Sequence, residues 1–223
     1  MWYNTYIDKS EKKENFFSQY GSYMHLILEM FSKQQLDFPE LVPYFEGNYD
    51  KFITEYPPFE KMETSYYNQA IDFLSTFEGF TDKTVGTELK MEYQIELYGK
   101  KRDFVAYIDR LSMDDNGYII NDYKSKGKFS SKAEKEKYLR QLYIYSLSVK
   151  EKYGVFPYKL KFNHFRTKSE TVELFNENKL LQTLKWADNC VERIYNTEIF
   201  VPNHNDFFCY HLCSVSDSCL TEA

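Results

Sequence analysis

Three consecutive runs with strand character occupy residues 86–98, 102–113 and 118–123, and short turn sequences separate them. Gly-Lys-Lys at residues 99–101 supplies the first turn, and Asp-Asp-Asn-Gly at residues 114–117 supplies the second. Asn-Gly is one of the pairs that tight hairpin turns favour. The pattern therefore predicts an antiparallel β-meander in the middle of the chain.

Helical patterns precede the meander. In residues 15–31, large apolar side chains recur at three- and four-residue spacing, as on the buried face of an amphipathic helix. A second helix is expected over residues 58–80, with Pro57-Pro58 as its start signal and Gly79 near its end. The segment between these helices contains prolines and aromatic residues, and its pattern favours no particular element.

Further elements follow the meander. We expect a helix over residues 131–153 that Gly154 ends, a fourth strand over 157–165 and a long helix over 176–195. An irregular, cysteine-bearing tail begins near residue 200. The order α-α-β-β-β-α-β-α predicts an α/β fold with a helical lead-in.

The chain is long enough for a single domain with elaborations. It has 223 residues, of which 43% are hydrophobic, so it can bury a substantial core and is not a disordered or low-complexity chain. We expect one domain over residues 1–223. It would consist of a helical lead-in (1–83), a βββαβ core (84–168) and a C-terminal helix with the tail (169–223).

The charges are unevenly distributed. The chain has 28 basic and 34 acidic residues, a net charge of −6 that disfavours a nucleic-acid partner, because Lys and Arg neutralise phosphates. Residues 1–98 hold 17 acidic and 8 basic side chains, whereas residues 99–168 hold 17 basic and 8 acidic ones. The basic side chains are densest over residues 124–140. Such a run is most often a solvated helix face, but the basic centre means that the acidic total does not exclude DNA.

Two carboxylates and a lysine lie near the ends of the second and third strands. Asp122 and Lys124 are two residues apart and therefore project from the same face of their strand, and the neighbouring strand brings Asp109 within reach. Converging carboxylates suit Mg²⁺ or Mn²⁺. A lysine beside such a metal can orient a water and stabilise charge on a phosphate. The set suits phosphodiester hydrolysis, although a salt bridge explains Asp-x-Lys alone about as well.

Four short motifs occur in order along the chain. They are Gly21-x-x-x-His25 with Glu29 one turn later, Ala106-Tyr-Ile-Asp109-Arg110, Asp122-Tyr123-Lys124, and Gln141 with Tyr145 on one helix face. This order resembles the RecB-like branch of the PD-(D/E)XK nucleases over roughly residues 15–220, with Ala106 where that family usually has Gly. The resemblance implies a restriction-endonuclease-like core of order αβββαβ, in which helices flank a central mixed sheet.

The resemblance also implies roles for individual residues. The metal ligands would be His25, Asp109, Asp122 and the backbone carbonyl of Tyr123, and Lys124 would be the catalytic lysine beside Asp109 and Asp122. The side chains that contact DNA or support the site would be Gln141, Tyr145, Lys126, Lys128 and Arg140. The family's acidic residue ahead of the Asp109 strand corresponds to either Glu88 or Glu92, and neither is expected to be a direct ligand. The metal would be Mg²⁺ or Mn²⁺.

Cysteines near the C-terminus form a second candidate site. Cys209, Cys213 and Cys219 resemble the C-terminal part of a cluster that, in this family, binds a [4Fe-4S] centre together with one cysteine far upstream. That upstream cysteine is missing, and the remaining one, Cys190, lies within the last predicted helix. Zn²⁺ held by the three cysteines and either Cys190 or His211 is an alternative, as are thiols that bind no metal.

We therefore expect a metal-dependent DNA nuclease. It would be an exonuclease or end-processing enzyme for single- or double-stranded DNA, in recombination, repair, phage DNA metabolism or CRISPR-type adaptation, with a helicase or recombination protein as a further partner. Alternatives are a non-catalytic DNA- or protein-binding subunit and a structure-selective endonuclease such as a junction resolvase. No apolar run reaches membrane-spanning length and no secretory signal is visible, so we expect a cytoplasmic protein of a bacterial or phage-infected cell.

Overall fold

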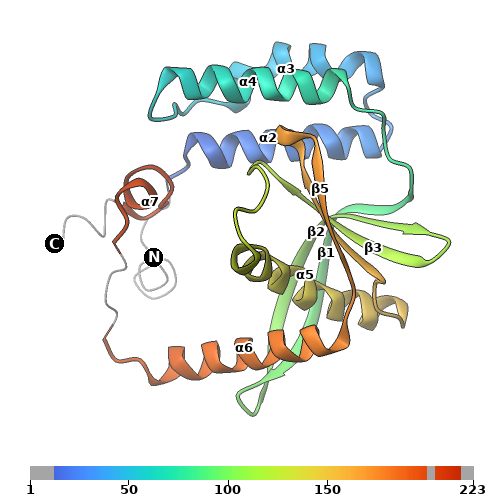
Figure 1. Cartoon of the computed structure of the whole chain (residues 1–223), viewed down its shortest axis with the longest axis vertical. Helices are drawn as coiled ribbons and strands as arrows, with labels where there is room; N and C mark the ends of the chain where they lie inside the picture. Colours follow the sequence, from blue (N-terminus) through green and yellow to red (C-terminus); the bar gives the residue numbers. More distant parts are fainter. Residues whose placement is uncertain (1–12, 200–203, 217–223) are drawn as a thin grey trace.

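The computed structural model describes residues 13–199 and 204–216. Helices surround a five-stranded sheet of order β1-β2-β3-β4-β5, in which β3 and β4 are parallel and the other neighbours are antiparallel (Figure 1). In chain order the elements are α2 (Phe16–Ser32), α3 (Phe38–Phe52), α4 (Glu60–Ser75), β1 (Lys83–Leu97), β2 (Lys100–Asp114), β3 (Gly117–Lys124), α5 (Lys132–Tyr153), β4 (Lys159–His164), η1 (Phe165–Thr167), β5 (Ser169–Leu174), α6 (Glu177–Asn196) and α7 (Asp206–His211). The predicted α/β fold, with a mixed sheet and a helical N-terminal region, is confirmed.

The predicted meander is confirmed as β1, β2 and β3. The first turn consists of Tyr98 and Gly99, and both have a positive φ, of 52° and 65°, as a tight hairpin turn requires. At the second turn the backbone N–H of Asn116 donates a hydrogen bond of 2.8 Å to the Asp114 carboxylate, and Gly117 has a φ of 128°. Both connections lie close to where the sequence predicts them, although Lys100 and Lys101, which were expected in the first turn, belong to β2.

Local capping explains two of the helices. The Asn15 side chain accepts a hydrogen bond of 3.0 Å from the backbone N–H of Ser18 and so begins α2 where the amphipathic pattern begins. Gly154 ends helix α5, where its backbone has a left-handed φ of 78°. The predicted helix over 58–80 is shorter in the structure and ends at Ser75.

Four elements were not predicted: α3, β5, the short helix η1 and helix α7, which lies in the tail that was expected to be irregular. Helix α3 contains Pro39, which is acceptable in a first turn, and Pro43, which lies inside the helix and weakens the sequence signal for one. Strand β5 is a six-residue edge strand with alternating exposure, and it has few of the apolar residues that mark a strand. It pairs antiparallel with β4 and extends the sheet beyond the predicted fourth strand.

Hydrophobic clusters lie on both sides of the sheet. One joins the sheet to α5 and α6 through residues such as Ile120, Leu142 and Phe162. The other joins α2, α3 and α4 to the sheet side chain Tyr123 and to Phe165. Figure 1 shows α3 and α4 stacked on α2, with α5 and α6 on the side of the sheet away from them. The C-terminal end of β3 and the middle of β2 consequently lie next to α2.

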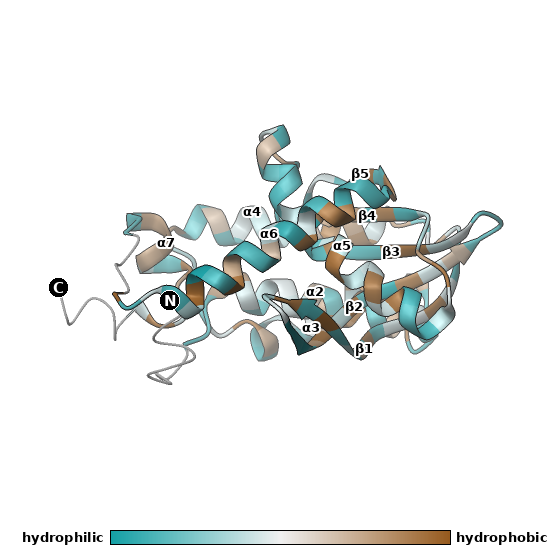
Figure 2. Cartoon of the chain, turned by 90° about the horizontal axis from the view of Figure 1, so that it is seen from below, coloured by the Kyte–Doolittle hydropathy of each residue, from teal (hydrophilic) through white to brown (hydrophobic). Residues whose placement is uncertain are grey.

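Coloured by hydropathy, helices and strands alike carry hydrophobic segments among hydrophilic ones (Figure 2). This mixture is expected of elements that bury one face and expose the other. Within residues 13–199 and 204–216, no helix has both the length and the apolar character that a membrane span needs.

Candidate active site

Strand β3 places Asp122 and Lys124 on one face, as the two-residue spacing predicts. The Asp122 side chain is 6% exposed, and its Oδ2 lies 2.7 Å from the Nζ of Lys124. Oδ2 makes no further hydrogen bond to any described residue, so this ammonium is the group that balances the buried charge. The predicted Asp122–Lys124 pair is therefore present, and the lysine side chain, which is 20% exposed, keeps contact with solvent.

Strand β2 brings Asp109 beside that pair. The register pairs Arg110 with Asn121, which puts Asp109 next to Asp122 on the same face of the sheet. The Oδ2 of Asp109 accepts a hydrogen bond of 2.7 Å from the backbone N–H of Tyr123. This bond fixes the position of the carboxylate against the end of β3.

Helix α2 supplies His25 to the same place. Its Nε2 lies 3.0 Å from the backbone carbonyl of Tyr123, and its Nδ1 lies 3.7 Å from Oδ2 of Asp109 and 3.9 Å from Oε1 of Glu88. When Nε2 donates its hydrogen to the carbonyl, Nδ1 presents a lone pair toward the two carboxylates. One imidazole nitrogen and two carboxylate oxygens then converge from α2, β1 and β2.

His25, Glu88 and Asp109 form a group whose ligand atoms all lie within 4.8 Å of one another. Among the described residues, this is the only cluster of three or more histidine, cysteine or acidic side chains with that spacing. Carboxylate oxygens with one imidazole nitrogen suit Mn²⁺ and Mg²⁺. The residues that are present therefore fit a divalent cation.

Glu88 is the side chain that the sequence motifs did not assign. It has a left-handed φ of 46°, and the pairs Thr87–Arg110 and Leu89–Ile108 on either side place it opposite Asp109. Glu92 lies elsewhere, 68% exposed, and forms an ion pair of 2.5 Å with Lys90. Glu88 therefore lies beside two of the predicted ligands, and its membership of the ligand set is a proposal.

Two predicted ligands have partners within the protein. Asp122 is paired with Lys124 and is not part of the group that His25, Glu88 and Asp109 form. The carbonyl of Tyr123 lies at the site, but it faces His25 Nε2 at hydrogen-bonding distance. The structure thus places the predicted ligands close together, with Asp122 in contact with Lys124 and the Tyr123 carbonyl in contact with His25.

The environment disfavours charge on the carboxylates. Burial raises the pKa of Asp109 and of Asp122 to about 6, and the negative charge of Asp109 adds to the shift of Asp122. Burial also raises the pKa of Glu88, with a further contribution from Asp109, and it lowers the pKa of His25. Lys124 opposes the shifts of both aspartates. A cation among these groups would relieve the same repulsion.

Helix α5 contributes the predicted Gln141 and Tyr145 pair. Nε2 of Gln141 donates a hydrogen bond of 2.9 Å to the Tyr145 hydroxyl, which confirms that the two residues share a helix face. Burial raises the pKa of Tyr145, and the charges of Asp122 and Asp109 raise it further. The Tyr145 hydroxyl therefore lies close enough to the two aspartates for their negative charges to raise its pKa.

The other predicted DNA-contacting side chains differ in their surroundings. Lys126 is exposed and forms an ion pair with Glu134, and Arg140 stacks over the ring of Trp186 at 4.5 Å. Lys128 is exposed. Two of the three cations thus have partners within the protein, and a contact with DNA remains a prediction for all of them.

The three cysteines that the structure describes do not belong to this site. Cys190, on α6, and Cys209 and Cys213, at the C-terminal end, are free thiols. They do not form a ligand group with each other or with His211 in the described part of the chain. Cys219 lies outside the described residues, so a [4Fe-4S] or Zn²⁺ site that includes it remains a prediction.

Three comparisons relate the chain to known proteins. No curated protein shows significant similarity to the chain. Among solved structures, SSO0001 is 17% identical, with a TM-score of 0.31 over 56% of this chain and 55% of that one, so the match spans about half of that protein. A presumed exonuclease from Eubacterium rectale is 16% identical, with a TM-score of 0.47 over 96% of this chain and 78% of that one. The family model of the PD-(D/E)XK nuclease superfamily matches residues 1–220, and the chain therefore belongs to that superfamily.

Proposed function

We propose that this protein is a Mg²⁺- or Mn²⁺-dependent deoxyribonuclease of the RecB-like branch, acting on DNA ends as an exonuclease or end-processing enzyme. The observation that carries the proposal is the convergence of His25, Glu88 and Asp109 beside the buried Asp122–Lys124 pair. The order of the sequence motifs, from the histidine on α2 to Gln141 and Tyr145 on α5, favours this branch.

In this proposal, different residues of the chain bind the cation and act on the substrate. His25, Glu88 and Asp109 would hold the cation, and a bound cation would lower the pKa of a water and offset phosphate charge. Asp122 holds the Lys124 ammonium at 2.7 Å. From there Lys124 would orient the attacking water and stabilise the charge that develops on the scissile phosphate.

The buried pair explains why a lysine suits this position. An ammonium is a compact cation with three donors, so Lys124 can keep one contact to Asp122 while others face a phosphate oxygen or a water. Its partial exposure of 20% leaves that side accessible. Hydrolysis then breaks the P–O bond to the leaving oxygen, which takes up a proton as the water's oxygen bonds to phosphorus.

We further propose that residues 1–223 act as one nuclease domain in the cytoplasm of a bacterial or phage-infected cell. The pathways that fit are recombination, repair, phage DNA metabolism and CRISPR-type adaptation, in which a helicase or recombination protein delivers DNA ends. Lys126 and Lys128 precede α5, Arg140 lies within it, and all three would contact the DNA backbone. Gln141 and Tyr145 would support the site or the strand within it.

Labelled DNA substrates test the proposal. We expect the protein to degrade linear single- or double-stranded DNA in Mg²⁺ or Mn²⁺, to be inactive in EDTA, and to leave a covalently closed circle intact because a circle has no end. Preference for a four-way junction over a linear duplex would instead indicate a structure-selective endonuclease. Salt-sensitive DNA binding without any cleavage in either metal would reject the enzymatic proposal and favour a non-catalytic subunit.

A further inference from the structure

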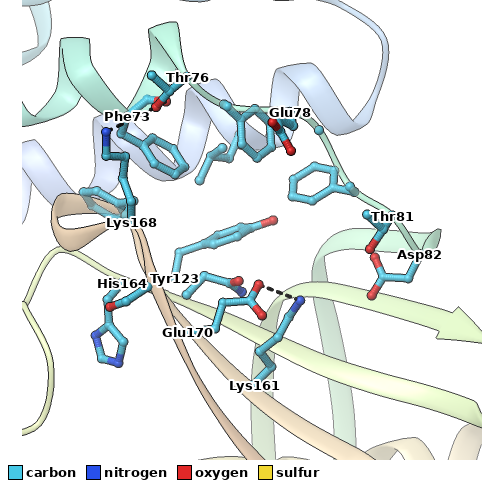
Figure 3. Close-up of a pocket in the computed structure, with 17 residues that line it drawn as sticks. Phe73, Thr76, Glu78, Thr81, Asp82, Tyr123, Lys161, His164, Lys168 and Glu170 are labelled. Atoms are coloured by element: carbon cyan, nitrogen blue, oxygen red, sulfur yellow. Dashed lines mark hydrogen bonds and ion pairs between the residues drawn. The ribbon is translucent and has the colours of Figure 1, made fainter.

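A cavity lies on the face of the sheet turned away from Asp122 and Lys124. It has a volume of about 370 Å³ and lies between the ends of β3 and β4 and the connection from α4 to β1 (Figure 3). Tyr123 and Asn163 are register partners on β3 and β4, so both side chains point to this face. The volume is within the range of pockets that hold small molecules.

The Tyr123 side chain points into this cavity (Figure 3). The residue is 5% exposed, and its hydroxyl is buried without a hydrogen-bond partner among the described residues. A buried hydroxyl left without a partner costs about 1–3 kcal/mol, and native proteins rarely keep one without a reason. The hydroxyl is therefore positioned to exchange a hydrogen bond with an occupant of the cavity.

Aromatic rings form much of the cavity wall. The ring centroids of Phe73 and Phe77 are 5.4 Å apart, those of Phe77 and Phe80 are 5.2 Å apart, and those of Phe80 and Tyr123 are 6.5 Å apart. Stacking on such rings stabilises a nucleobase by about 1–3 kcal/mol and depends little on which base is bound. The wall therefore favours a flat, heteroaromatic occupant.

The polar groups of the cavity favour recognition of a base rather than a phosphate. Lys161 forms an ion pair of 3.0 Å with Glu170, and Lys168 forms one of 2.6 Å with Asp72, so both lysines at the rim are already neutralised. The Asn163 side chain has no partner among the described residues. An Asn amide can donate to and accept from the N6/N7 edge of adenine at the same time.

We propose that this cavity binds a purine base, with adenine preferred, stacked against the phenylalanine rings and hydrogen-bonded to Tyr123 and Asn163. The base would come from a free nucleoside or nucleotide, or from an unpaired position in a DNA strand. The backbone of Tyr123 contacts Asp109 and His25 on the other side of β3, so the occupant lies directly behind the candidate metal centre. Base binding does not require cleavage, whereas any effect on cleavage rests on the proposed function.

Equilibrium binding to the full chain in EDTA tests this site without catalysis. The ligands are adenosine, AMP, cytidine and a four-residue deoxyadenosine oligonucleotide. We expect adenosine and AMP to bind with similar affinity, because the rim lysines are paired, and cytidine to bind about tenfold more weakly. If the oligonucleotide displaces AMP, the natural source is a DNA base; if it does not, the source is a free nucleoside or nucleotide.

Substitutions locate the binding. Tyr123→Phe and Asn163→Ala should each weaken adenosine binding about tenfold, and thermal unfolding should show Tyr123→Phe to be at least as stable as wild type, because it removes a hydroxyl that lacks a partner. Lys124→Ala should bind adenosine as wild type does. The proposal is overturned if millimolar adenosine does not bind, if cytidine binds equally well, or if Lys124→Ala loses binding that Asn163→Ala retains. Because EDTA prevents cleavage, none of these outcomes bears on the nuclease proposal.

Discussion

Replacement of Asp109 by Asn should make the metal-free protein more stable and should abolish normal binding of the metal ion. The Asp109 side chain is 13% exposed, and Oδ2 accepts the Tyr123 N–H at 2.7 Å. An Asn side chain keeps an oxygen that can accept this bond but carries no charge. The substitution therefore removes one buried negative charge from a site that already contains Asp122 and Glu88.

The size of the effect follows from the pKa of Asp109, which burial raises from an ordinary 3.8 to about 6. A pKa that folding raises by about 2 corresponds to about 3 kcal/mol of unfolding free energy. Because Asp122 titrates together with Asp109, we expect a gain in unfolding free energy of about 1–3 kcal/mol. For a protein of this length the melting temperature should rise by about 3–10 °C.

The pH dependence of stability shows whether the Asp109 charge raises or lowers the free energy of unfolding. A carboxyl whose pKa is raised on folding binds a proton more tightly in the folded state, so the contribution of Asp109 to wild-type stability is greatest at low pH and declines as the pH rises through about 6. The Asn variant avoids this decline. Its advantage should be present at pH 8 and small at pH 4.5.

Thermal denaturation in EDTA at these two pH values measures the difference. Added Mn²⁺ should then raise the melting temperature of wild type but not that of Asp109→Asn, because only the former keeps the ligand set. A variant that is less stable than wild type at pH 8, or equally more stable at both pH values, would refute the reasoning about buried charge. Equal stabilisation of both proteins by Mn²⁺ would refute the assignment of Asp109 as a ligand.

Three further predictions concern other parts of the account. Glu88→Gln should weaken Mn²⁺ binding at least about tenfold in a calorimetric titration, whereas Glu92→Gln, on the same strand but exposed, should not; equal effects would exclude Glu88 from the ligand set. Mn²⁺ affinity should fall about tenfold per pH unit below pH 6, because protons compete for the carboxylates; a pH-independent affinity would contradict this. Arg110→Ala should cost about 3–5 kcal/mol in urea denaturation, since Arg110 is 1% exposed and pairs at 2.5 Å with Asp82, whose side chain is 9% exposed; a loss below about 1 kcal/mol would contradict it.

Much of the scaffold could be predicted because its signals are local. The Asn116-Gly117 pair marks one hairpin, and Gly154 marks the end of α5. The two-residue spacing of Asp122 and Lys124 is enough to place both on one face of a strand. In each case the sequence over a few residues determines the backbone conformation, so distant contacts do not alter the outcome.

What could not be predicted depends on distant contacts or unusual backbone conformations. Helix α3 forms despite Pro43 because Leu41, Phe45 and Tyr49 are buried against neighbouring helices, and tertiary packing outweighs the weak local signal. Glu88 reaches the site through a left-handed φ that no local pattern indicates in a strand. The unpartnered hydroxyl of Tyr123 likewise becomes apparent only when the cavity around it is seen.

DNA cleavage by matched lysine variants tests the central claim most directly. Wild type, Lys124→Ala and Lys90→Ala should be compared on end-labelled linear DNA in Mn²⁺, because Lys90 is an exposed lysine on β1 that is paired outside the site with Glu92. We expect wild type and Lys90→Ala to degrade the DNA at similar rates and Lys124→Ala to be slower by at least about a hundredfold. Cleavage by Lys124→Ala at the wild-type rate, or no cleavage by wild type, would contradict the account.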